Sequence, residues 1–158
     1  MKNFMRRGFF ALIVVLNFIS CSSDDNGGGG QEGIEFAGTW VLTEINVSAP
    51  IDADNDGTTS SNLLDEVDCL RDTLVLNETF EWNSTEVVAT LITQITNDLF
   101  NVSCSDERTQ NGNWGVSGSN LLLVGSVNRT FLIDGNQLIE NLAQDLPGIR
   151  TRVYNRQE

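Results

Sequence analysis

Short apolar segments joined by tight-turn residues recur along the chain from Phe36 to the C-terminus. Turn residues separate two extended runs within 72–82, within 111–127 and within 129–142, and a last run follows at 149–156. The third turn contains Asp134-Gly135, and Asp-Gly between apolar runs is a strong hairpin signal. Successive hairpins form an antiparallel meander, which loses its exposed edges by closing on itself. The sequence therefore predicts an all-β fold, an antiparallel up-and-down meander that closes into a barrel or a strongly curled sheet.

The first strand is predicted at 39–47, where strand-favouring residues dominate. Strict alternation places Trp40 and Leu42 on one face of this strand. The same alternation places Val41, Ile45 and Val47 on the opposite face.

Two other stretches depart from simple alternation. Apolar residues at helical spacing in 60–70 predict one short helix after an acidic loop, with Asn62 and Asp65 forming a capping box. The stretch 86–100 fits the helical and the extended period equally. Its many β-branched residues favour a strand.

The N-terminal segment has the pattern of a bacterial lipoprotein leader. Basic residues are followed by an apolar run at 9–19, which is too short for a transmembrane helix, and by Ser20-Cys21. The tetrapeptide FISC resembles a lipobox, in which the cysteine is acylated and the leader is cut off before it. We therefore predict a signal peptide at 1–20, lipidated Cys21 with a Gly-rich flexible tether at 21–33, and one folded domain at 34–158. The alternative is an ordinary secretory leader.

This anchor determines the expected location of the protein. Two or three acyl chains hold a protein stably on a membrane. Acidic residues directly after Cys21 also resemble the surface-export signal of lipoproteins in the Bacteroidetes lineage. The expected location is the outer membrane, on the cell surface or on the periplasmic face.

The charge and the residue types exclude several functions. All 22 acidic residues follow Cys21, whereas only six arginines and no lysine do, so this part has a net charge of 6 − 22 = −16. Such a charge argues against nucleic acid as a partner. The chain has no histidine, which excludes serine–histidine and cysteine–histidine catalysis and histidine-bound zinc. A hydrolase using paired carboxylates is the remaining enzymatic alternative, and we expect a non-catalytic protein.

The other two cysteines, Cys69 and Cys104, are expected to form a disulfide. Export places them in an oxidising compartment, where a bridge is the default. The alternative is a pair of buried free thiols.

The acidic loop at 51–69 suggests a calcium site. Its pattern fits the start of an EF-hand-type loop, with a glycine, Gly57, at the sixth position. The oxygen-bearing residues at the first, third, fifth and seventh positions are Asp52, Asp54, Asp56 and Thr58. The twelfth position is Leu63, which cannot bind a metal, so the closing carboxylate would be Asp65 or Glu66 after a longer loop. The alternative is a solvated acidic turn.

Several motifs together resemble the lipocalin-like domain lipoproteins of Bacteroidetes. They are the lipobox leader, Gly38-Thr39-Trp40 near the start of the domain, DTLVLNETFEW at 72–82 and CSDERTQNGNWGVSGSNLLL at 104–123. The resemblance implies a lipocalin-like barrel in which Trp40 plugs one end beneath an arginine of the last strand, Arg150 or Arg152. It also favours Glu66 as the closing ligand of the calcium site.

The resemblance and the composition together give two expected functions. The first is a non-catalytic protein that binds a small or apolar ligand in the barrel mouth. The alternative is a calcium-stabilised cell-surface interaction module with a filled barrel. The aromatic residues expected in the core are Phe80, Trp82, Trp114 and Phe131. The sequence leaves the ligand and any protein partner unidentified.

Overall fold

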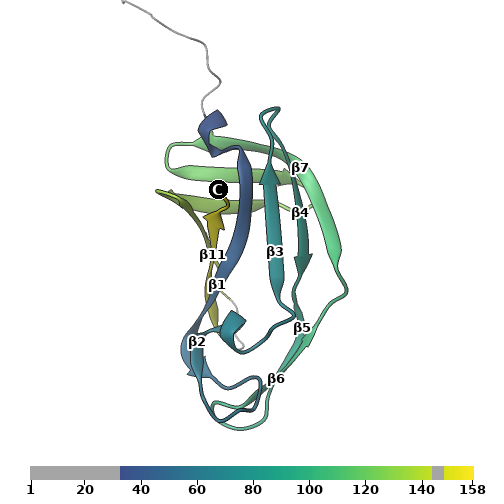
Figure 1. The fold of residues 1–158 in the computed structure, drawn as a ribbon, viewed down its shortest axis with the longest axis vertical. Coiled ribbons are helices and arrows are strands. Elements are labelled where there is room, and N and C mark those ends of the chain that lie inside the picture. The colour runs from purple at the N-terminus through teal and green to yellow at the C-terminus, as the bar shows by residue number, and fades with distance from the viewer. Residues whose placement is uncertain (1–32, 144–147) are drawn as a thin grey trace, which may run out of the picture.

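The computed structural model describes residues 33–143 and 148–158. The predicted signal peptide, Cys21 and nearly all of the tether lie outside these residues. The described part is a closed antiparallel barrel of eight strands with a small two-stranded sheet beyond one end (Figure 1). Neither of its two helical turns, each three residues long, could cross a bilayer.

The elements follow one another along the chain with short connections. They are η1 (Ile34–Phe36), β1 (Gly38–Ile51), β2 (Ser60–Asn62), η2 (Leu63–Asp65), β3 (Arg71–Leu76), β4 (Glu81–Val87), β5 (Ala89–Gln94), β6 (Phe100–Cys104), β7 (Arg108–Ser117), β8 (Asn120–Gly125), β9 (Arg129–Asp134), β10 (Gln137–Asn141) and β11 (Ile149–Arg156).

The barrel closes because β1 pairs with both β3 and β11. The strand order is β11-β10-β9-β8-β7-β4-β3-β1, and the β1–β11 ladder joins Trp40 with Arg156 at one end and Val47 with Ile149 at the other. All pairings between these strands are antiparallel. The predicted up-and-down meander and its closure are confirmed.

An irregularity in β1 corrects the predicted faces of this strand. Trp40, Leu42, Ile45 and Val47 are all buried, whereas alternation placed the first two opposite the last two. The register with β11 shifts between Leu42 and Glu44. Such a bulge inserts an extra residue and reverses the alternation beyond it, so both halves of the strand face the core.

The two ambiguous stretches form a lobe at one end of the barrel. The predicted helix is only the 3-10 turn η2, which Asn62 caps by accepting a hydrogen bond from Leu64 N at 3.2 Å. The stretch 86–100 contains strand β5, as predicted, but not as one strand: it runs from the end of β4 through β5 and a bend at 95–98 into β6. In Figure 1 this hairpin lies with β2 and η2 at the bottom of the barrel.

Aromatic side chains fill the opposite end. Trp82, Trp114 and Phe131 are 2%, 4% and 0% exposed, so three of the four predicted aromatic core residues are buried. Phe80 is half-buried and packs on Trp114 with 4.8 Å between ring centroids.

Trp40 closes this end, but the arginine above it is not one of the two expected. The guanidinium of Arg156 lies 5.8 Å from the Trp40 ring, and Trp40 Nε1 donates to Phe36 O at 3.0 Å. Arg156 also donates to Glu35 O at 2.8 Å, which ties β11 to η1. The last strand pairs along its whole length with β1, so its final arginine reaches Trp40, whereas Arg152 pairs with Ile45 further down.

Candidate functional site

A layer of polar and charged side chains crosses the barrel interior between the aromatic end and the η2 lobe. Alternation along each strand points these residues inward. They are Asp72 on β3, Glu86 on β4, Arg108 and Gln110 on β7, Arg129 on β9, Glu140 on β10, and Arg152 and Tyr154 on β11.

Arg129 is the centre of this layer, and its side chain is only 7% exposed. Its Nε and NH2 donate to the two oxygens of Glu140 at 2.9 and 2.8 Å, and its NH1 donates to Asp72 Oδ2 at 3.0 Å. Its guanidinium also lies 4.8 Å from the centroid of the Phe131 ring. Bidentate arginine–carboxylate geometry is a strong and specific form of this contact. The network therefore joins β3, β9 and β10 through the barrel interior.

Tyr154 completes the network from β11. It is 0% exposed, donates from Oη to Asp72 Oδ2 at 2.7 Å and accepts a hydrogen bond from Arg129 NH2. Burial raises the pKa of this phenol strongly, the positive charge of Arg129 opposes that rise, and the negative charge of Asp72 adds to it. The structure therefore favours the neutral phenol.

Tyr154 is the only tyrosine in the chain, so its ionisation can be followed directly. We expect no tyrosinate absorbance in the folded protein when the pH passes through about 10, the pKa of an unfolded tyrosine. Because folding favours the neutral form, this contribution to stability is complete below about pH 10 and is lost as the pH rises further. Alkaline titration at 295 nm, with far-UV circular dichroism on the same samples, tests this. A tyrosinate signal that precedes unfolding would contradict it.

A second group of charges lies on the neighbouring strands. Arg108 Nε donates to Glu86 Oε1 at 2.9 Å, and Gln110 Nε2 donates to the same oxygen at 2.6 Å. Arg152 is held more loosely, because its NH1 lies 3.8 Å from Glu140 Oε2. The Glu86 side chain is 2% exposed, whereas that of Arg108 is 53% exposed and lies nearer to solvent.

The charges of the layer balance. Three carboxylates face three guanidiniums, and each carboxylate has at least one arginine within 3.0 Å. Half of the six arginines that follow Cys21 therefore belong to this layer. Buried charges persist when they are paired and hydrogen-bonded. Arg129 and the three carboxylates meet this condition, whereas Arg152 Nε has no hydrogen-bond partner among the described residues.

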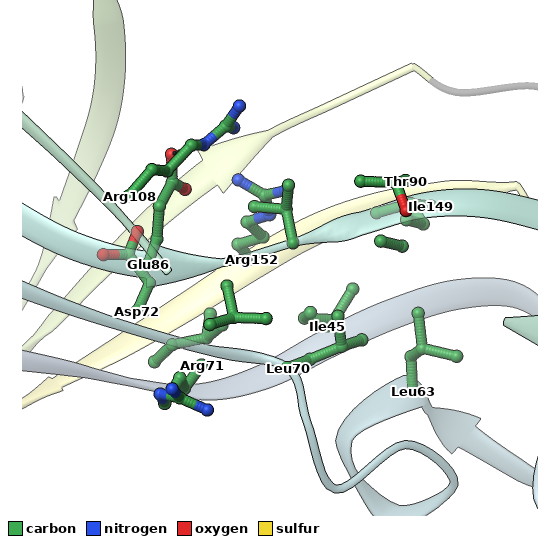
Figure 2. Close-up of a pocket in the computed structure, with 14 residues that line it drawn as sticks. Ile45, Leu63, Leu70, Arg71, Asp72, Glu86, Thr90, Arg108, Ile149 and Arg152 are labelled. Atoms are coloured by element: carbon green, nitrogen blue, oxygen red, sulfur yellow. Dashed lines mark hydrogen bonds and ion pairs between the residues drawn. The ribbon is translucent and has the colours of Figure 1, made fainter. Parts of the chain in front are cut away.

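A cavity of about 360 Å³ opens on the η2 side of this layer. Figure 2 shows Asp72, Glu86, Arg108 and Arg152 at one end of it. Aliphatic side chains from β1, β4, β11 and the η2 lobe form most of its remaining wall, among them Leu42, Ile45, Leu63, Leu70, Val87 and Ile149. A second hollow of about 170 Å³ shares Glu86, Arg108 and Arg152 with the first and extends to Gln110, Arg129 and Glu140.

The acidic loop lies outside the barrel, beside the β5–β6 hairpin. Asp52 N donates to Asp98 O at 2.7 Å, and Phe100 N donates to Asp52 O at 2.8 Å. The structure brings Asp52, Asp54 and Glu66 together, with one carboxylate oxygen of each within 4.8 Å of the others. Oxygen donors at this spacing suit a hard divalent cation such as calcium.

Backbone N–H groups donate hydrogen bonds to two carboxylates of this acidic cluster. Asp52 accepts hydrogen bonds from Asn55 N at 2.7 Å and Gly57 N at 3.1 Å, and Glu66 accepts one from Ala53 N at 3.0 Å. The two Asp52 bonds are the ones expected of an acidic turn, and the Glu66 bond ties this turn to the end of η2.

The carboxylate of Asp56 is not part of this cluster, and Thr58 is hydrogen-bonded to Asp56. Asp56 accepts hydrogen bonds from the side chain and backbone of Thr58, which lower the pKa of this exposed carboxyl. The calcium site therefore stays a prediction, and the geometry separates Asp52, Asp54 and Glu66 from Asp56 and Thr58.

This separation gives matched variants for a calcium test. If the cluster binds calcium, calcium at ten times the dissociation constant stabilises the fold by about 1.4 kcal/mol. Melting in calcium and in chelator should then differ by a few degrees. The difference should disappear in Asp54→Asn and persist in Asp56→Asn. Identical melting of the parent protein in both buffers would remove calcium from the description.

The predicted disulfide between Cys69 and Cys104 is present. Cys69 directly precedes Leu70, which lines the cavity, and Cys104 pairs in register with Ala89, which also lines it. The bridge therefore joins two walls of the cavity.

The charged layer was not predicted from the sequence. The available signal was a charged residue at an inward position of a predicted strand, as at Asp72, Glu86 and Glu140. A sequence in which 20% of residues are charged offers many such positions, and only the barrel closure shows which ones meet.

No family model, curated protein or solved structure matches the chain.

Proposed function

We propose that this protein is an exported, lipid-anchored lipocalin-like protein that binds a small ligand of mainly apolar character inside its barrel. The observation that carries the proposal is the cavity of about 360 Å³ behind the η2 lobe. Its volume is within the range of small-molecule sites, roughly 300–1,000 Å³. Mainly aliphatic walls with a few convergent polar groups are also typical of such sites.

The cavity lies where a ligand could enter. The aromatic end is sealed by Trp40 and Trp82, which are 1% and 2% exposed. At the other end the wall includes half-exposed and exposed positions, among them Thr90 and Arg108. A ligand would therefore enter on the side of the β5–β6 hairpin.

A binding role also accounts for the buried carboxylates better than catalysis does. Asp72 and Glu140 are both held by Arg129, and Glu86 is held by Arg108 and Gln110. Carboxylates tied in this way form the wall of a site. The alternative, a calcium-stabilised interaction module, requires a filled barrel and leaves the cavity without a role.

Cavity filling tests the proposal. We expect saturable binding of the neutral fluorescent probe N-phenyl-1-naphthylamine to the purified protein, with a micromolar dissociation constant. Ala89→Trp places a large side chain against the cavity without removing a core residue, and should weaken probe binding about tenfold or more, the effect of roughly 1.4 kcal/mol.

The matched control is Thr93→Trp, on the same strand at an exposed position outside the cavity lining. It should bind the probe like the parent protein, which separates barrel binding from probe held by acyl chains or detergent. Equal probe binding by both variants, or no saturable binding by the parent, would exclude a ligand in the barrel.

A further inference from the structure

Three buried polar atoms of residues that line the two hollows have no hydrogen-bond partner among the described residues. They are Asp72 Oδ1, Gln110 Oε1 and Arg152 Nε. Asp72 lines the larger hollow, Gln110 lines the smaller one, and Arg152 lines both. Asp72 is 2% exposed and its other oxygen is engaged by Arg129 and Tyr154. An unpaired group at such depth has a substantial free-energy cost, so a bound molecule gains by pairing with it.

These three atoms need hydrogen-bond partners of defined types. Asp72 Oδ1 and Gln110 Oε1 accept hydrogen bonds, and Arg152 Nε donates one. The orientation of the Gln110 amide is determined by Glu86, because the Gln110 group that faces Glu86 Oε1 at 2.6 Å must be the donor. A ligand head that satisfies all three needs two donors and one acceptor.

The balance of charge in the layer argues against an ionised head. Three arginines already match three carboxylates there, and an added carboxylate or ammonium would be a buried charge without a counter-charge. The rest of the chain after Cys21 has three arginines and 19 acidic residues, 3 − 19 = −16. This exterior further disfavours the approach of an anion.

We propose that the ligand is a neutral amphiphile whose head carries both hydrogen-bond donors and an acceptor, the pattern of a primary amide. This inference rests on the proposed function of the same cavity. The head lies against Asp72 and Arg152, and the tail lies along Ile45, Leu70 and Ile149, which Figure 2 shows to the right of Asp72. Such a head replaces the hydrogen bonds of the water that it displaces, which a purely apolar ligand does not.

The volume limits the length of the tail. At about 30 Å³ for each water molecule, 360 Å³ corresponds to about a dozen water molecules, 360/30 = 12. A ligand with about ten non-hydrogen atoms matches this volume. An eight-carbon chain with a small head is therefore a suitable probe.

Three octyl ligands with different heads test the inference on the unmodified protein. Octanamide, octanoate and octylammonium have nearly the same size, and their affinities can be measured by displacement of N-phenyl-1-naphthylamine at neutral pH. We expect octanamide to bind about tenfold or more tightly than either ion. In Arg152→Met the affinity for octanamide should fall several-fold more than the affinity for the naphthylamine probe measured on the same variant.

The outcomes separate this inference from the proposed function. Octanoate or octylammonium binding as tightly as octanamide would overturn the neutral head and leave the ligand-binding barrel standing. Displacement by none of the three, with the probe still bound, would do the same. Failure of the probe itself to bind would overturn both.

Discussion

Replacing Arg129 with methionine is expected to lower the free energy of unfolding by about 3–5 kcal/mol, the typical cost of breaking a buried ion pair from one side. Methionine keeps much of the length of the side chain and removes its charge. Asp72 and Glu140, which are 2% and 7% exposed, would then lose the guanidinium that holds them both. Tyr154 would lose its charged donor as well. The network joins β3, β9, β10 and β11, so the loss of stability is not confined to one pair of strands.

Arg71→Met is the matched control for this prediction. Arg71 also pairs with a carboxylate at 3.0 Å, that of Glu107, but the two side chains are 58% and 55% exposed. Such a surface pair contributes about 0–1 kcal/mol. Urea denaturation of the two variants, followed by tryptophan fluorescence, compares the same chemical change at a buried and an exposed site. Similar losses in both variants would show that burial of the network does not matter to the fold.

Much of the architecture was predictable because hairpins are determined by local sequence. Gly118 and Gly135 both take a positive φ of 58°, which suits glycine, and each joins two strands that the sequence predicted. Asn77 shapes the β3–β4 turn by accepting hydrogen bonds from Thr79 N at 3.1 Å and Glu81 N at 2.8 Å. Turn chemistry of this kind is visible in a stretch of a few residues.

Features that depend on distant segments were predicted less well. The bulge at Leu42–Glu44 appears only in the pairing of β1 with β11, and it moves Ile45 and Val47 to the core face. The arginine above Trp40 is likewise selected by that register, which is why Arg156 occupies the place expected for Arg150 or Arg152. Alternation within one strand contains no information on either point.

The candidate site shows the same division. The acidic loop is formed by residues close in the chain, so the proximity of Asp52, Asp54 and Glu66 could be predicted from the sequence. Asp56 and Thr58 were predicted to join them, but they bond to each other. The charged layer is not local, since Arg129 and Asp72 are 57 residues apart in the chain. Its members face one another only after β11 has returned to β1. A cavity wall built from residues so far apart in the chain has no local sequence motif.

Removing the disulfide is the other change with a large expected effect. Cys69 and Cys104 are 35 residues apart, and a crosslink of this length stabilises the fold by about 2–4 kcal/mol, mainly by restricting the unfolded chain. The variant Cys69→Ser/Cys104→Ser should therefore unfold at lower urea than the oxidised protein, and reducing agent should shift the parent but not the variant.

The position of the bridge adds a functional consequence. It joins the segment before Leu70 to the strand that pairs with Ala89, so it holds two cavity walls together. We expect the serine variant, measured where it is still folded, to bind N-phenyl-1-naphthylamine several-fold more weakly. Unchanged probe binding in the serine variant would mean that packing of η2 and β5 holds the walls without the bridge. In that case the bridge would stabilise the domain and have no part in shaping its cavity.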